Sequence, residues 1–427
     1  MTSIADTSTP VAVLRSVGYG GLNILRSLGR LRVPVYNIDP NPFAPAFASK
    51  YCRGRFWGDI EQWPAERALD YLWKIRQKIG RPCLLIPTTD DTSIFVAENS
   101  AILREWFIFP QLSASKVRSL SNKKQMYQVA KNFHIPTPAT VFPESRQDVQ
   151  TFLRDAAFPV MLKAIDGARL WRRTGQKMVI VQSESELLKK YDEMEDAGNP
   201  NLMLQEYIPG GDDAIWMFNG YFNEKSECLA AFTGKKIRQY PIHKGVTSLG
   251  ECVANPVITK KTVEFLKAFG YRGIVDLGYR FDRRDGSYKI LDINPRIGAT
   301  FRLFVGDNGM DVARALYLNL TGQPVAFGVP HEGRRWIVED FDFVSSIRYR
   351  LEGTLSLKQW LASLRGVEEA AYFAADDFLP VLPMLMNGAG KLLNKSFRKI
   401  VGVLGLRRRA GQLQNIRRIH SALRLQK

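Results

Sequence analysis

The chain has few cysteines for its length, only four in 427 residues. They stand at Cys52, Cys83, Cys228 and Cys252, and no two of them form a CxxC pair. The four histidines are scattered as well, so a zinc site with clustered ligands is not expected. This pattern fits a reducing compartment better than a disulfide-stabilised secreted protein.

Long apolar runs are also missing. No stretch reaches the roughly 18 apolar residues of a membrane-spanning helix, and the start, MTSIADTSTP, lacks the basic and apolar parts of a secretory signal. The sequence therefore predicts a cytoplasmic protein. With 45% hydrophobic and 24% charged residues, the composition excludes a mostly disordered chain.

Acidic residues are scarce near the C-terminus. The formal net charge is +18, and residues 391–427 hold eleven basic residues and no acidic one. Within 391–404 the apolar side chains fall on one helical face, which is typical of a helix lying on a membrane surface. Three roles stay open for this basic tail: docking on an anionic membrane at its inner face, packing on the protein's own body, or binding nucleic acid. Nucleic acid is the least expected partner, because a strongly apolar face suits lipid or a protein core better than phosphates.

The N-terminal part alternates between strands and helices. An apolar run at 11–14, a glycine-containing loop at 16–21, a helical pattern and a second apolar run at 33–38 make a βαβ unit. Residues 11–115 therefore read as an α/β domain with a parallel sheet, after a frayed segment 1–10. The glycines lack the G-x-G-x-x-G spacing, so a tight turn is preferred to a dinucleotide site.

Residues 116–325 read as an α+β domain with antiparallel strands. We expect helices at 121–133, 185–195 and 257–269, and strands at 159–163, 178–181, 202–206, 215–222, 228–233, 274–281 and 288–293. Residues 164–177, which are rich in arginine, are expected to form a loop. The segment 326–390 is a C-terminal extension with a helix at 357–364 and a linker at 376–383.

The predicted hairpin over 274–293 carries the most informative side chains. Successive side chains of a strand face opposite ways, so Asp276 faces away from its apolar neighbours, and Asp292 and Asn294 share one face. Mg²⁺ prefers such convergent oxygen ligands. Arg296 follows two positions later and suits a phosphate or a carboxylate. The alternative is a solvated hairpin face, which explains one Asp but not this set.

Two lysines point to an anionic ligand. Lys163 ends an apolar strand, where its charge is costly unless it meets an anion. Lys123 begins the preceding helix. The segment 205–213, QEYIPGGDD, resembles a hinge whose backbone could pair with an adenine edge, although a plain glycine turn remains an equal alternative.

In this order, these elements resemble the ATP-grasp superfamily, and within it the carboxylate–amine ligases similar to D-aspartate ligase. The resemblance covers roughly residues 11–325 and rests on these motifs: LDINPR at 291–296, NKK at 122–124, IPTP at 135–138 and FTGKKIRQYP at 232–241. It implies a Rossmann-like domain over 11–115, an ATP-grasp fold over 116–325 with a central lid at about 140–205, the extension 326–390 and a helical basic tail 391–427.

The resemblance also implies roles for single residues. Those for ATP are Lys123 and Lys163 on the phosphates, Gln205, Glu206 and Ile208 at the adenine, and Asp212 or Asp213 on the ribose. Those for Mg²⁺ (or Mn²⁺) are Asp276, Asp292 and Asn294. Arg296 and Lys163 would be catalytic, with Arg296 on the transferred phosphoryl group. Two departures are the Asp residues where many members carry Glu and the arginine-rich loop after Lys163.

A basic stretch at 235–244, expected between strands, gives a weaker signal. Lys236, Arg238 and His243, together with Arg296, are candidates for holding substrate carboxylates, and a solvated loop is the alternative. The implied activity joins a carboxylate to an amine through an acyl phosphate, on an amino acid or a cell-envelope or polysaccharide precursor. Alternatives are an ATP-grasp enzyme with a non-amine acceptor and a silent nucleotide-binding protein recruited by its tail. The sequence does not disclose the oligomeric state; the resemblance leaves a homodimer open, because related ligases often dimerise.

Overall fold

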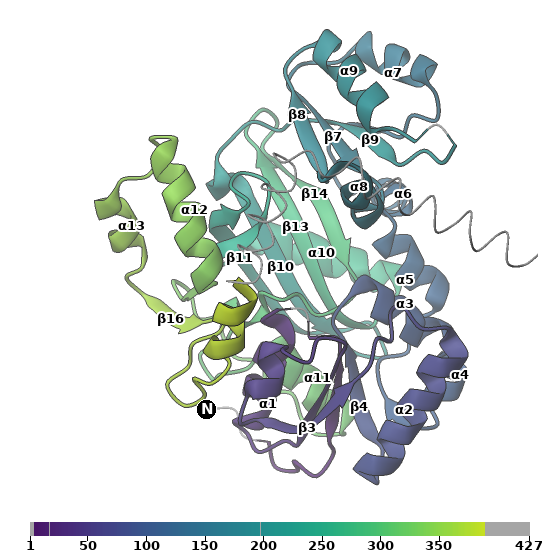
Figure 1. Ribbon diagram of the computed structural model, residues 1–427, viewed down its shortest axis with the longest axis vertical. Coiled ribbons are helices and arrows are strands. Elements are labelled where there is room, and N and C mark those ends of the chain that lie inside the picture. The colour runs from purple at the N-terminus through teal and green to yellow at the C-terminus, as the bar shows by residue number, and fades with distance from the viewer. Residues whose placement is uncertain (1–3, 17, 197, 389–427) are drawn as a thin grey trace, which may run out of the picture.

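In the computed structural model, the described residues are 4–16, 18–196 and 198–388, and they form three sheets that stack along the long axis of the molecule (Figure 1). The helical basic tail predicted at 391–427 lies outside these residues. Among the described helices, none combines the length and apolar content needed to cross a bilayer.

The N-terminal sheet is parallel, as the sequence predicts. Its strands are β1 (Val11–Leu14), β2 (Val35–Asp39), β3 (Cys52–Trp57), β4 (Cys83–Pro87) and β5 (Phe107–Ile108), in the order β3-β2-β1-β4-β5. Helices α1 (Gly20–Gly29), α2 (Ala65–Ile79), α3 (Asp90–Glu98) and α4 (Ser100–Leu103) accompany it. The strand order reverses between β1 and β4, and ligands of open parallel sheets bind at the carboxyl ends of strands at such a point.

The central sheet has seven strands. In spatial order they are β14 (Ser287–Asn294), β13 (Gly273–Asp282), β10 (Ile215–Phe222), β11 (Cys228–Tyr240), β12 (Val246–Cys252), β15 (Arg335–Ile337) and β16 (Val367–Ala370). All neighbours are antiparallel except the last pair. The sheet extends past the boundary expected at 325, because β15 and β16 come from the C-terminal extension. Strand β11 also continues to Tyr240, so the basic stretch expected between strands lies largely within a strand.

Both faces of the central sheet are covered. On one face, Phe218 and Phe222 of β10 pack with Phe265 of α10 (Pro256–Phe269). On the other, Met217 and Tyr221 pack with residues of α11 (Val312–Leu320). The alternation of side chains along β10 therefore serves two cores. Other helices outside the third sheet are α5 (Ala114–Ser121), α6 (Lys123–Asn132), α12 (Glu339–Leu351) and α13 (Leu357–Ser363).

The third sheet forms a separate lobe at the top of Figure 1. Its strands are β6 (Thr140–Val141), β9 (Leu202–Glu206), β7 (Val160–Ala164) and β8 (Met178–Val181), in the order β6-β9-β7-β8, with helices α7 (Arg146–Leu153), α8 (Gly167–Thr174) and α9 (Glu184–Met194). This lobe corresponds to the segment expected to act as a lid.

Helix α8 corrects the sequence prediction of a loop over 164–177. The Asp166 carboxylate accepts a hydrogen bond from the Arg169 backbone N–H at 3.0 Å, which is a helix-start bond. At the other end, Gly175 has φ +73° and donates to the Trp171 carbonyl at 2.8 Å. Asp166 and Gly175 therefore delimit a helix that the arginine-rich composition concealed.

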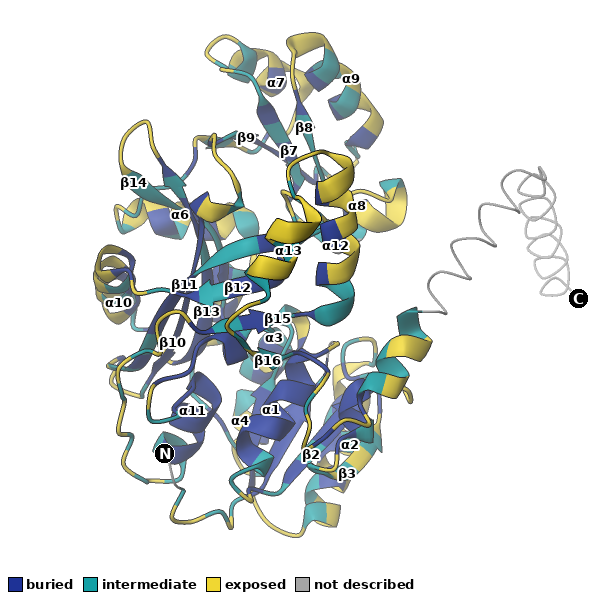
Figure 2. Cartoon of the chain, turned by 90° about the vertical axis from the view of Figure 1, so that its left-hand side faces the viewer, coloured by how far each residue is buried: buried dark blue, intermediate teal, exposed yellow. Residues whose placement is uncertain are grey.

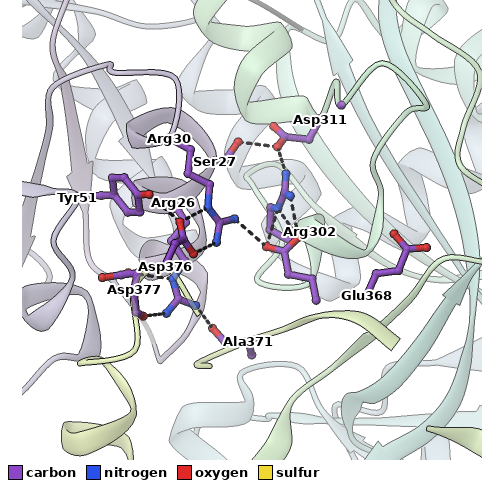
Figure 3. Close-up of polar contacts among 12 residues, drawn as sticks. Arg26, Ser27, Arg30, Tyr51, Arg302, Asp311, Glu368, Ala371, Asp376 and Asp377 are labelled. Atoms are coloured by element: carbon purple, nitrogen blue, oxygen red, sulfur yellow. Dashed lines mark hydrogen bonds and ion pairs between the residues drawn. The ribbon is translucent and has the colours of Figure 1, made fainter. Parts of the chain in front are cut away.

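The C-terminal extension is anchored to the N-terminal domain. Arg26 of α1 is fully buried, and its Nε donates to Asp377 Oδ2 at 3.0 Å (Figure 3). Arg30 pairs with Asp376 at 2.9 Å. The linker predicted at 376–383 is irregular up to residue 380, as expected. Two carboxylates fix its start, and a helix begins at residue 381, before the predicted end.

Candidate active site

The three predicted metal ligands converge at the end of the β13–β14 hairpin. Asp276 and Asn294 are directly opposite in the register, and Asp292 stands opposite Gly278. The Asn294 amide nitrogen lies 3.5 Å from Asp276 Oδ2 and 3.4 Å from Asp292 Oδ2. Among the described residues, no three or more His, Cys, Asp or Glu side chains lie close enough together to bind one metal ion. The candidate set is therefore two carboxylates and one amide, which fits a hard cation that completes its shell with phosphates and water.

The two carboxylates differ electrostatically. Burial raises the pKa of Asp276 to about 6, although nearby Arg296 and Lys236 work against the rise. Burial also penalises the charged form of Asp292, but Lys123, Lys163 and Arg296 together outweigh it and lower the pKa of this carboxyl. The Asp292 side chain keeps 38% of its surface exposed, so the two carboxylates lie in a partly buried place that a cation from solvent can reach.

Both predicted phosphate lysines reach this place from other elements. Lys123 is the first residue of α6, and its amino group pairs with Asp292. Lys163 lies on β7 of the lobe formed by the third sheet. Its pKa is lowered to about 8 by burial and by Lys123, against the attraction of Asp292. Helix α6, this lobe and the central sheet therefore bring two lysines and two carboxylates together.

Arg296 connects the hairpin to the N-terminal domain. Its Nε lies 2.9 Å from Asp90 Oδ1, and its Nη2 donates to Asn294 Oδ1 at 3.2 Å. Asp90 is the first residue of α3, in the turn that follows β4. Gly20 of α1 also approaches the same region, since a Cβ placed there would lie 3.3 Å from Ala299. Both loops at the reversal of strand order therefore face the candidate site.

The sequence reasoning missed two residues that surround Asp276. Asn219 of β10 is directly opposite Asp276 in the register and is fully buried. Neither of its amide atoms makes a hydrogen bond of good geometry, but the amide is near enough to the Asp276 carboxylate to lower its pKa. Gly298 lies against the Asp276 carboxylate, because an added Cβ would be 2.6 Å from its Cγ. Asn219 could have been noticed in the sequence, because it is a polar residue in the apolar strand IWMFNGYF. No feature of the sequence indicated that Gly298 lies near the site.

Comparisons with known proteins agree with this geometry. No family model matches the chain. D-aspartate ligase from Enterococcus faecium is 26% identical over 242 residues, which are 54% of this chain and 57% of the relative. The chain thus matches little more than half of that enzyme's length.

Solved structures extend the likeness to most of the chain. N5-carboxyaminoimidazole synthetase from Staphylococcus aureus, solved with ADP, has a TM-score of 0.58 and 12% identity and covers 78% of this chain and 82% of its own. L-amino acid ligase from Bacillus licheniformis has a TM-score of 0.53 and 14% identity, and the match covers 77% of this chain and 76% of that ligase. The chain has an ATP-grasp fold. It is similar in sequence to a carboxylate–amine ligase of this fold.

In this ATP-grasp fold, the predicted adenine segment is held by its own side chains. The Gln205 amide donates to Tyr127 Oη at 2.7 Å and to Thr140 Oγ1 at 2.9 Å. Lys289 pairs with Glu206 at 2.9 Å, which lowers the pKa of the carboxyl against the effect of burial. The side chains of Gln205 and Glu206 therefore hold the end of strand β9 in place.

The backbone after this strand is braced too. The Ile208 carbonyl accepts a hydrogen bond from Arg280 Nε at 2.7 Å, and the Gly210 carbonyl accepts one from Arg280 Nη2 at 2.5 Å. Arg280 therefore fixes the course of the hinge, a role that the sequence did not suggest.

The two carboxylates predicted to bind the ribose lie in different surroundings. Asp212 accepts a hydrogen bond from Gln239 at 2.9 Å and another from the Tyr349 hydroxyl. Asp213 is exposed and lies 3.6 Å from Arg283. Of the two, Asp212 is the one whose charge reaches Lys236 in the site.

The predicted substrate cations also separate. Burial lowers the pKa of Lys236 to about 8, against the attraction of Asp276, Asp212 and Asp292. Its amino group donates to the Gly245 carbonyl at 2.9 Å, so Lys236 is near the candidate site and is held by its own segment. Arg238 does not, because its buried guanidinium pairs with Asp342 at 2.8 and 2.9 Å. Its assignment to substrate is withdrawn. His243 is half-exposed at the edge and contacts Glu352 at 2.8 Å.

Proposed function

We propose that this protein is an ATP-dependent ligase that joins a carboxylate to an amine through an acyl phosphate. The observation that carries the proposal is the meeting of Lys123, Lys163, Asp276, Asp292 and Arg296, which come from helix α6, strand β7, and the β13–β14 hairpin with the turn that follows it. Cations and oxygen ligands gathered in one partly buried place suit phosphoryl transfer, in which positioning and charge neutralisation do most of the work.

The residues divide this work. Lys123 and Lys163 would bind the phosphates of ATP, with the adenine against the segment 205–208 and the ribose near Asp212. Asp276, Asp292 and Asn294 would hold Mg²⁺, which supplies charge neutralisation at the phosphates.

Two bond exchanges follow. A substrate carboxylate oxygen attacks the γ-phosphorus, the bond to the β–γ bridging oxygen breaks, and ADP leaves. The amine then attacks the acyl carbon, the carbon–oxygen bond to the phosphoryl group breaks, inorganic phosphate leaves and the nitrogen loses a proton. Arg296 can donate hydrogen bonds to the phosphoryl oxygens and then to the oxyanion at the acyl carbon. Lys236 would hold a substrate carboxylate.

The test is phosphate and ADP release from Mg·ATP with a panel of acids and amines, offered singly and in pairs. We expect release that needs one acid and one amine together, and its loss in Asp292→Asn. The matched control is Asp285→Asn, an exposed carboxylate in the turn of the same hairpin, which should retain the activity.

Other outcomes would redirect the proposal. Release with an acid alone would indicate a non-amine acceptor. ATP binding without turnover across the panel would indicate a silent nucleotide-binding protein or a larger acceptor, such as an envelope or polysaccharide precursor. The homodimer and the membrane role of 391–427 stay predictions.

A further inference from the structure

Helix α12 exposes an apolar face to solvent. Phe343, Val344, Ile347 and Leu351 are 57, 37, 43 and 84% exposed, and their spacing places them on one side of the helix. The opposite side is buried and polar, and it includes Asp342 and Ser345. The usual pattern is therefore inverted: this helix packs its polar side inward and leaves its apolar side uncovered.

Helix α13 continues this face. Leu357 and Leu361 are 47 and 54% exposed, and the two helices lie side by side and largely exposed in Figure 2. The Trp360 indole donates a hydrogen bond to Asp342 at 3.1 Å, so the two helices are fixed to each other. We call the exposed apolar residues of both helices the α12–α13 face.

Positive charges outnumber negative ones among the exposed residues around this face. Arg348, Arg350, Lys358 and Arg365 are all exposed, whereas Asp340, on the same helical side one turn before Phe343, is half-buried. The acidic Glu352 between the helices lies 2.8 Å from His243. An apolar face bordered by cations is the pattern of a helix that rests on an anionic lipid surface.

The charge of the α12–α13 face favours an anionic lipid surface over other binding partners. A second copy would bring the same four cations against themselves, and the chain's own tail 391–427 adds only positive charge. Nucleic acid would match the charge but not the apolar residues. We propose that the α12–α13 face docks on an anionic membrane surface.

Docking would orient the candidate active site. Helix α12 is tied to β11 by the buried pair of Arg238 and Asp342, and its Tyr349 hydroxyl bonds Asp212. The membrane would therefore lie beside the wall of the nucleotide site. This placement suits an acceptor presented at the lipid surface, although the docking itself does not depend on the proposed function.

The test is flotation of the full-length protein with vesicles of phosphatidylcholine alone and of phosphatidylcholine mixed with phosphatidylglycerol. We expect binding to the mixed vesicles only. Replacing Phe343, Ile347 and Leu351 together by Ser should lower the bound fraction about tenfold or more, because three apolar side chains no longer enter the interface. Val257→Ser is the control, since Val257 is 50% exposed on α10 and should leave binding unchanged.

A second variant separates the face from the tail. Arg348→Glu with Arg350→Glu should weaken binding to the mixed vesicles. Unchanged binding in both the serine and the glutamate variants would assign all lipid binding to the tail and overturn the proposal. Absence of wild-type binding would also overturn it. So would a wild-type dimer that the serine variant converts to a monomer in light scattering, because the occupant would then be a second copy.

Discussion

Asp276 is supported on three sides, and each support has a different physical basis. Asn294 opposes it from β14, Asn219 opposes it from β10, and Gly298 leaves space for its carboxylate. An unpartnered amide that is fully buried is costly. Asn219 therefore makes sense as a group that orients Asp276 or a water on a bound cation, as residues behind metal ligands do.

The first prediction concerns Asn219→Ala. We expect the Mg²⁺ concentration for half-maximal turnover to rise about tenfold or more, because the ligand carboxylate loses its orienting neighbour. Thermal stability should change little, since no hydrogen bond is lost. Asn23→Ala is the control, because Asn23 is also buried with an unpartnered amide but lies on α1. Equal Mg²⁺ dependence in both variants would refute the positioning role.

The second prediction concerns Gly298→Ala. Its new Cβ would lie 2.6 Å from Asp276 Cγ, so the carboxylate must move. A displacement of this kind can lower turnover about a hundredfold. Gly278→Ala on the same hairpin is the control, because its Cβ would meet only Asp292 Cβ at 3.9 Å. The measurement is the steady-state turnover of the two variants. Similar values would contradict the close packing of Gly298 against the Asp276 carboxylate.

At the scale of elements, α8 divides its arginines between two tasks. Arg169 donates to the Asn199 carbonyl and Arg173 to the Glu195 carbonyl, both at 2.6 Å. These bonds tie the helix to its own lobe. Arg172 is exposed on a different side from the buried Leu170. If the lobe closes over ATP, Arg172 is the arginine with freedom to contact the phosphates.

The third prediction follows from this division. Arg172→Ala should raise the KM for ATP about tenfold through loss of a charge-assisted hydrogen bond, with little change in melting temperature. Arg173→Ala should instead lower the melting temperature and leave the KM nearly unchanged. The reverse result would show that α8 does not act as a lid.

At the scale of the whole molecule, buried ion pairs join the C-terminal extension to both other parts. Glu369 of β16 pairs with Arg302 at 2.7 Å and with Arg334 at 2.6 Å. Arg302 also pairs with Asp311, as Figure 3 shows. Burial opposes the charged form of Glu369, but Arg302 and its neighbours lower the pKa to about 2. The extension is therefore part of the folded body.

The fourth prediction is the pH dependence of this network. The lowered pKa of Glu369 contributes stability that is fully present above its usual pKa of 4.5 and is lost as pH falls toward 2. Glu369→Gln should lower the free energy of unfolding at neutral pH by roughly 3 kcal/mol, because Arg302 and Arg334 lose a buried partner. Melting curves should show a smaller acid-induced loss in the variant. An equal loss in both proteins would refute the coupling.

The order of elements could be predicted from the sequence because periodicity and turn residues are local. The common face of Asp276, Asp292 and Asn294 followed from alternation along two neighbouring strands, and the predicted strands 178–181, 202–206 and 215–222 match the structure. Arg238 could not be judged this way. Its partner Asp342 is 104 residues away, and a sequence pattern does not show which cation meets a carboxylate and which stays in the site.

The sequence by itself determined the type of most main elements, though not of α8, and the oxygen-bearing side chains on one face of a hairpin. These features depend on neighbours within a few positions. Only the tertiary structure decided that Lys163 comes from a separate lobe to that hairpin, that Asn219 and Gly298 enclose Asp276, and that α12 turns its apolar side outward. Each of these depends on contacts between distant segments, whose free energy comes from packing and burial in the folded molecule and leaves no periodic mark in the chain.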